Sequence, residues 1–171
     1  MVNTASHPPT GTPAQAHRAV GQAARVLSLR VEAYVRALAQ HTGHHATDLH
    51  ALGIVREHPY GGDPVGPTSL ARDLGLSAPA VSALLDRMER AGHVQRSRSA
   101  GDGRRIGVVP TGLGAQASRV HFEGMNERYH EVLAGYTAEQ LELVAEVMDR
   151  LAEATAEAAS AIEGSPPGQQ R

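Results

Sequence analysis

Apolar residues recur at steps of three and four positions in two long segments, residues 16–40 and 137–163. This period is that of a helix that buries one face. Thr137 and Gln140 have the spacing of a capping box, and acidic residues fill the gaps in the apolar pattern of the last segment. We predict a long helix in each segment, with the last one forming a seam that needs a partner helix. The apolar positions are Val20, Ala24, Leu27, Val31, Tyr34 and Leu38 in the first, and Leu141, Val144, Met148, Leu151, Thr155, Ala158 and Ile162 in the last.

Capping residues and helix breakers divide the middle of the chain into three short helices. Serine and threonine before an apolar run favour a helix start, whereas glycine and proline favour an end. Gly92 is expected to take the left-handed conformation that closes the third helix. The predicted helices, each starting at its N-cap residue, run from Thr47 to the residue before Pro59, from Thr68 to Leu74, and from Ser77 to Ala91.

The two helices on either side of Gly75 have the spacing of a helix-turn-helix. Ala71 is small enough for the helices to approach, and Val81 and Leu84 lie where they reach back to the core. The opposite face of residues 77–87 is then directed outward, and a helix of this size fits the major groove of DNA.

Two short extended segments follow, HVQRSR at residues 93–98 and RIGVVP at residues 105–110. A turn rich in glycine, aspartate and serine joins them, which predicts a β-hairpin. Pro110 ends the second strand, because proline cannot donate to a ladder.

Both ends of the chain are rich in proline, glycine and small polar residues, so residues 1–15 and 164–171 are expected to be disordered tails. The chain has 171 residues, of which 41% are hydrophobic, and this suffices for one domain with a proper core. We predict a single folded domain over residues 16–163, in which Thr111 begins a long helix that stops near Gly135.

The net charge of −2 hides two oppositely charged regions. All 16 basic residues are arginines, and residues 87–105 hold six of them against Glu89 and Asp102. Residues 137–163 hold seven acids against Arg150. The basic middle indicates a negatively charged partner, and the acidic last helix is expected to face away from it.

The hairpin turn brings arginines to its tip. Arginine is planar and weakly hydrated, so it can enter the narrow minor groove of A·T-rich DNA. Arg104 and Arg105 suit that role, Arg96 and Arg98 suit the flanking phosphates, and Asp102 either ties a nearby arginine and shapes the turn or is a solvated turn residue. The DNA-binding candidates on the helices are Thr68, Ser77, Ala78, Pro79, Ala80, Ser82 and Arg87.

Several quoted segments together resemble the MarR family of bacterial transcription regulators. They are TDLHAL, SLARDLGLSAPAVSALLDRMERAGHVQRSR and DGRR, followed by a Thr-x-x-Gly at Thr111 and Gly114. The resemblance covers residues 16–163, and its most specific element is the Asp-x-Arg at Asp102 and Arg104. Two departures are Pro110, where the family commonly has leucine, and the long loop PYGGDPVGP.

The resemblance implies a mostly α fold with a small β-wing, a winged helix-turn-helix with N- and C-terminal dimerisation helices. Residues 16–42 and 111–163 would form the dimer and residues 47–110 the winged helix-turn-helix. It implies a homodimer that binds double-stranded DNA at an inverted repeat, with the recognition helix in the major groove, Arg104 at the wing tip and Asp102 supporting it. It also implies a small-molecule effector that weakens the binding.

No motif marks an effector pocket, and we expect no cofactor. The effector-binding candidates are Arg25 and Tyr34 on the first helix and His44 and His45 in the loop after it. Some relatives bind zinc through histidines and acids, but the spacing of His41, His44, His45 and His50 is not that of a local zinc site, so zinc is not favoured and no metal ligand is assigned.

The sequence lacks features that other function classes require. The chain has no cysteine, hence no disulfide or thiolate site, and no signal peptide or membrane-spanning run, so we expect a cytoplasmic protein. The sequence shows neither a nucleophile with a neighbouring base nor a phosphate-binding glycine loop, so we do not expect an enzyme. The favoured hypothesis is a ligand-responsive repressor. The alternatives are a non-sequence-specific architectural DNA-binding protein, a metal-responsive regulator of the same fold, and a helical protein-interaction module that has kept the fold but not the DNA contacts.

Overall fold

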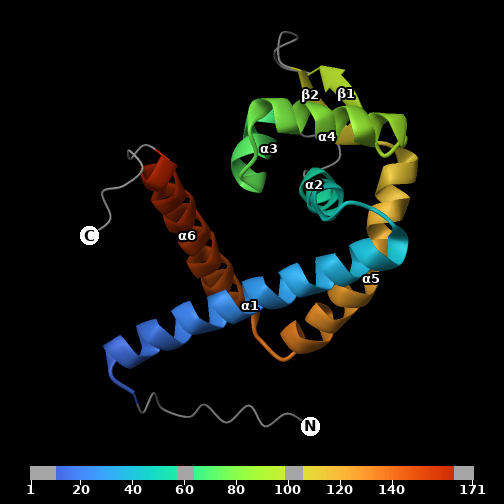
Figure 1. The fold of residues 1–171 in the computed structure, drawn as a ribbon. Helices are drawn as coiled ribbons and strands as arrows, with labels where there is room; N and C mark the ends of the chain where they lie inside the picture. The colour runs from blue at the N-terminus through green and yellow to red at the C-terminus, as the bar shows by residue number, and fades with distance from the viewer. Residues whose placement is uncertain (1–10, 58–63, 99–105, 164–171) are drawn as a thin grey trace. The chain divides into compact units, whose positions relative to one another are not determined.

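The computed structural model describes residues 11–57, 64–98 and 106–163, which form helices and a two-stranded antiparallel sheet (Figure 1). This confirms the predicted mostly helical fold with a small β-wing. No helix in these three ranges has the length and apolar character needed to cross a membrane. The elements are α1 (Pro13–Thr42), α2 (Ala46–Glu57), α3 (Pro67–Leu74), α4 (Ala78–Arg90), β1 (Val94–Arg98), β2 (Ile106–Pro110), α5 (Gly112–Leu133) and α6 (Ala138–Glu163).

The chain divides into two compact units, and α1 and α5 each contribute to both. One unit is Leu27–Asn126 and contains α2, α3, α4 and the hairpin. The other combines Met1–Val26 with Glu127–Arg171 and contains α6.

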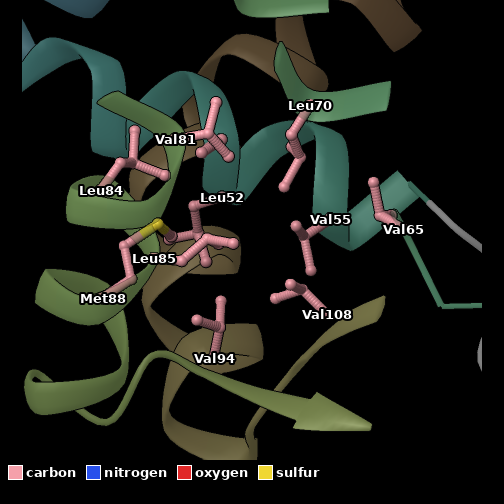
Figure 2. Packing of buried hydrophobic residues seen from close by; sticks show 11 residues of the cluster. Leu52, Val55, Val65, Leu70, Val81, Leu84, Leu85, Met88, Val94 and Val108 are labelled. Carbon is pink, nitrogen blue, oxygen red and sulfur yellow. The ribbon is translucent and has the colours of Figure 1, made fainter. Parts of the chain in front are cut away.

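The core of the Leu27–Asn126 unit is a cluster of aliphatic side chains from α2, α3, α4 and both strands (Figure 2). Val81 and Leu84 of α4 are 1% and 2% exposed, and Ala71 of α3 packs against the cluster, as the helix-turn-helix spacing predicts. The cluster holds α4 by one face only and leaves its opposite face in solvent. Its buried members are Ala51, Leu52, Val55, Val65, Leu70, Val81, Leu84, Leu85, Met88, Val94 and Val108.

The turn between α3 and α4 follows from its residues. Gly75 closes α3 with a φ of 62°, a conformation that only glycine adopts readily. The hydroxyl of Ser77 accepts a hydrogen bond from the backbone N–H of Ala80, which confirms Ser77 as the N-cap of α4. Gly92 likewise has a φ of 72° just after α4, as predicted.

Two predicted helix starts are wrong by one or two positions. Thr68 is not the N-cap of α3, because Pro67 occupies the first turn, where its missing N–H is not needed, and Gly66 becomes the N-cap. Thr47 is not the N-cap of α2, because the helix begins at Ala46 and the carbonyl of His45 accepts its first hydrogen bonds. The first helix also begins earlier than predicted, at Pro13.

The two strands pair in antiparallel register from Val94 opposite Pro110 to Arg98 opposite Ile106. Val65 adds a third short segment, since its N–H and carbonyl both bond to the backbone of Val108. The sequence predicts only a loop at Val65, whereas the structure ties the end of that loop to the wing.

The Thr-x-x-Gly sequence joins α5 to the turn after α4. The hydroxyl of Thr111 accepts from the N–H of Gly114 at 3.0 Å and donates to the carbonyl of Gly92. A Cβ on Gly114 would lie 1.8 Å from the carbonyl oxygen of His93, so only glycine permits this packing. Thr111 therefore caps α5, as predicted, and also fixes α5 to the start of the wing.

In the other unit, α6 begins with the predicted capping box. The N–H of Thr137 donates to the side chain of Gln140 at 2.9 Å, and the N–H of Gln140 donates to the Thr137 hydroxyl at 3.3 Å. None of the α6 side chains at residues 138–162 is buried. Val144 and Met148, on its apolar seam, are 53% and 37% exposed within the single chain.

Candidate nucleic-acid interface

The face of α4 opposite the core carries only short side chains near its N-terminus. Ser77, Ala78, Pro79 and Ser82 are exposed, and Ala80 is half-buried. Thr68, in the first turn of α3, is exposed as well. Apart from Arg87, the sequence-predicted contact residues of α3 and α4 are therefore exposed or half-exposed, and none of them has a long side chain that keeps the α4 backbone away from a ligand.

Arg87, near the C-terminal end of α4, is bound within the protein. Its Nε donates to Oδ2 of Asp48 at 2.8 Å, and its second terminal nitrogen donates to Oδ1 of the same carboxylate. The Asp48 side chain is only 11% exposed. The hydrogen bond from Asp48 raises the pKa of Arg87 above its usual value. Two parallel hydrogen bonds of this kind fix both distance and orientation, so the pair joins α4 to α2.

Arg96 of β1 is also bound to carboxylates. It donates to Asp86 at 2.7 Å and to Glu89, and the carboxylate of Glu89 accepts from the Arg96 backbone N–H at 3.0 Å as well. The hydrogen bond to Asp86 raises the pKa of Arg96. Both acids lie on α4, so this network links the first strand of the wing to the helix beside it.

The remaining wing candidates fall largely outside the described residues. Arg98 ends β1, opposite Ile106. The prediction for its side chain, and those for Asp102, Arg104 and Arg105, concern parts of the chain that the structure does not describe.

The four effector-binding candidates lie in different surroundings. Arg25 is exposed on the part of α1 that belongs to the unit with α6. In the other unit, the hydroxyl of Tyr34 donates to the carbonyl of His121 at 2.6 Å, and His45 is exposed at the start of α2. His44 packs against other histidines, as described below.

A cavity of about 200 Å³ lies within the Leu27–Asn126 unit, between α1, α2 and α5. Its walls are mostly apolar, and the guanidinium carbon of Arg56 lies 5.9 Å from the ring centre of Phe122. On α2, His50 also pairs with Glu32 at 3.4 Å. The lining residues are Val31, Val35, Leu49, His50, Gly53, Ile54, Arg56, Phe122, Met125 and Asn126, and none of the four effector candidates is among them.

Three histidines distant in sequence meet in the same unit. The ring of His44 lies 5.5 Å from that of His93 and 5.4 Å from that of His121, between ring centres. Burial, and then the neighbouring His44, lower the pKa of both His93 and His121. No periodic pattern announces this grouping, because each ring comes from a different segment. Within residues 11–57, 64–98 and 106–163, no group of three or more histidines and acids is placed to hold a metal ion.

Comparisons with known proteins identify the fold and the family. A sequence model described as MarR family matches residues 42–105. The HTH-type transcriptional regulator YcgE of Bacillus subtilis (strain 168) is 33% identical over 120 residues, which are 70% of this chain and 75% of that protein. The chain belongs to the MarR family.

Solved structures show the same fold at lower identity. S. aureus MepR in its DNA-binding conformation has a TM-score of 0.60 and 20% identity, over 77% of this chain and 94% of that one. MarR from Oenococcus oeni PSU-1 has a TM-score of 0.57 and 16% identity, over 78% of this chain and 98% of that one. This MarR-family chain therefore has the winged helix-turn-helix fold that its motifs predict.

The family match spans the elements of the candidate interface. Residues 42–105 extend from the end of α1 through α2, α3, α4 and β1 to the sequence DGRR. The family-model match thus covers the same segments that present the small exposed face of α4.

Proposed function

We propose that this MarR-family protein is a cytoplasmic transcription regulator that binds an inverted repeat as a homodimer and represses until a small effector weakens the binding. The observation that carries the proposal is the α3–α4 pair, whose outer face is exposed and lined by small side chains next to an arginine-rich hairpin. Major-groove recognition needs such an exposed helix beside elements that contact the backbone.

The N-terminal half of α4 is the part that reads base edges. Ser82 offers a hydroxyl to bases or phosphate, and Ala80 offers a methyl group to thymine. Ser77, Ala78 and Pro79 let the first turn approach the phosphates, where the helix N-terminus favours negative charge. Thr68 lies on the neighbouring helix and contributes a backbone contact.

The arginines divide into two groups. Arg98, Arg104 and Arg105 bind DNA, with Arg104 in the minor groove and Asp102 shaping the turn that presents it. Arg87 and Arg96 contribute to DNA binding indirectly, by positioning α4 and the wing, because carboxylates within the protein already bind their guanidinium groups. They hold α4 against α2 and the wing against α4.

The exposed seam of α6 supports the homodimer. Val144 and Met148 lie on it and are 53% and 37% exposed in one chain, which leaves apolar surface for a second copy to cover. A two-fold dimer places two recognition helices roughly 34 Å apart, one turn of DNA, and this spacing predicts an inverted repeat.

The cavity between α1, α2 and α5 is the effector site that the structure favours. Its mixture of apolar walls with Arg56, His50 and Asn126 suits a small apolar anion. The four effector candidates from the sequence do not line it, so an effector bound there would meet a different set of residues.

Selection of duplexes from a random pool at near-physiological salt tests the proposal. Enrichment of an inverted repeat is the expected result. Retention without enrichment would favour an architectural DNA-binding protein, and no retention would contradict DNA binding. Ala83→Glu, which places an acid on the exposed face of α4, should abolish retention, whereas Ala14→Glu, at an exposed alanine of α1 outside the proposed dimerisation residues 16–42, should not.

A further inference from the structure

The three clustered histidines come from separate segments of the Leu27–Asn126 unit. His44 precedes α2, His93 lies between α4 and β1, and His121 lies on α5. With ring centres 5.4 and 5.5 Å apart, His44 contacts both other rings. Its Nδ1 is buried and has no hydrogen-bond partner. The three rings are thus closely packed, and one of them has a buried polar atom without a hydrogen-bond partner.

The charged groups near the histidine cluster connect it to α4. From α2, the carboxylate of Asp48 attracts a proton to His93, although burial and His44 outweigh it and lower the pKa of His93. From α4, Arg87 holds that same carboxylate. From α1, the hydroxyl of Tyr34 bonds the backbone carbonyl of His121 and not its ring.

We propose that His44, His93 and His121 form a proton-responsive cluster that loosens the hold of Asp48 on the recognition helix when the pH falls. A proton on one ring places a positive charge next to two other imidazoles and in partly buried surroundings. A charged His93 is attracted to Asp48 and competes with Arg87 for the carboxylate. The response goes beyond the proposed regulation by an effector, because it needs no ligand.

The direction of the effect follows from the pKa values. The pKa values of His93 and His121 are lowered in the folded protein, so the unfolded chain binds more protons as the pH falls below about 6.5. Neutral His93 and His121 therefore favour the folded state above that pH, and this contribution is lost as the pH falls toward the folded-state pKa values of these two residues. Acidification is expected to weaken the packing around the turn between α4 and β1.

The first test follows the histidine ring protons of the full-length protein by NMR between pH 8 and pH 5, with EDTA present. In His44→Gln, the midpoints of His93 and His121 should both rise, because the neighbouring His44 lowers the pKa of each in the native protein. His130→Gln, at an exposed position of α5, should leave both midpoints unchanged. Midpoints that do not respond to His44→Gln would overturn the cluster, as would midpoints that shift when EDTA is omitted, since a metal ion would then be the ligand.

The second test measures the response of α4. Amide protection factors of residues 84–88 should fall as the pH falls. The fall should be about tenfold for each unit by which the histidine pKa values differ between the state in which Asp48 holds Arg87 and the state in which this hold is loosened. His44→Gln should reduce the fall. If the midpoints of His93 and His121 respond to His44→Gln but the protection of α4 does not change with pH, the proposed coupling between the histidines and α4 is overturned. Neither readout uses DNA, so a failure of the proposed function would appear separately, as absent DNA binding at every pH.

Discussion

Arg87 on α4 and Asp48 on α2 form a bidentate ion pair between these two helices, with the carboxylate almost completely buried. The pair connects α4, the proposed recognition helix, to α2, which lines the cavity proposed for the effector, since Leu49, next to Asp48, is part of the cavity wall. A change at the cavity therefore has a short path to α4. The pair also gives the guanidinium group of Arg87, near the end of α4, a partner within the protein.

Asp48→Asn should lower the free energy of unfolding by about 1–3 kcal/mol, because it leaves the Arg87 guanidinium without its charged partner. Urea denaturation checks this value. Asp73→Asn is the matched control, since Asp73 pairs with Arg72 at the surface and exposed pairs contribute little. Equal losses in the two variants would contradict the structural role of Asp48.

Gly114→Ala should destabilise the protein by about 1–3 kcal/mol, because the new Cβ would collide with the backbone carbonyl of His93. Gly124→Ala, in the same helix with open space around it, should instead stabilise by up to about 1 kcal/mol. Thermal or urea unfolding of the two variants measures the difference. If Gly114→Ala were as stable as Gly124→Ala, the close packing of α5 on the wing would be refuted.

Arg104→Ala should weaken binding to the selected duplex by about 1–3 kcal/mol while leaving the dimer and the helix content unchanged. The reason is the loss of a minor-groove contact and not of any core packing. Fluorescence anisotropy with labelled duplex gives the affinity, and Arg128→Ala on α5 is the control. Unchanged affinity in Arg104→Ala would show that the wing assignment is incorrect.

The α6 seam gives a prediction about assembly. Val144→Glu combined with Met148→Glu should produce a monomer, because two acids would face the same seam of the second copy. Leu143→Glu, on a different face of α6 and 61% exposed, should stay dimeric. Analytical ultracentrifugation distinguishes the two results. A dimer that survives the double substitution would place the interface elsewhere.

Local signals in the sequence predicted most of the elements. The Ser77 cap, the left-handed Gly92 and the capping box of Thr137 are confirmed, because each depends on residues within one turn of one another. The helix-turn-helix packing was also predictable, because the residues that make it lie within a stretch of fourteen residues.

Interactions between distant segments were not predictable. Asp48 and Arg87 lie 39 residues apart, and nothing periodic connects them. The meeting of His44 with His93 and His121 likewise depends on the tertiary fold. The acids that bind Arg96 were visible on α4, but a basic run next to a predicted recognition helix favours a phosphate contact until the strand register is known.

In the proposed function a symmetric dimer reads two half-sites one helical turn apart, and a duplex with a different distance between its half-sites shows whether it does. Inserting five base pairs between the selected half-sites rotates one of them by about half a turn, to the opposite side of the duplex. Affinity for this duplex should fall to that for a single half-site. Equal affinity for the original and the lengthened duplex would contradict recognition by two recognition helices in a fixed dimer.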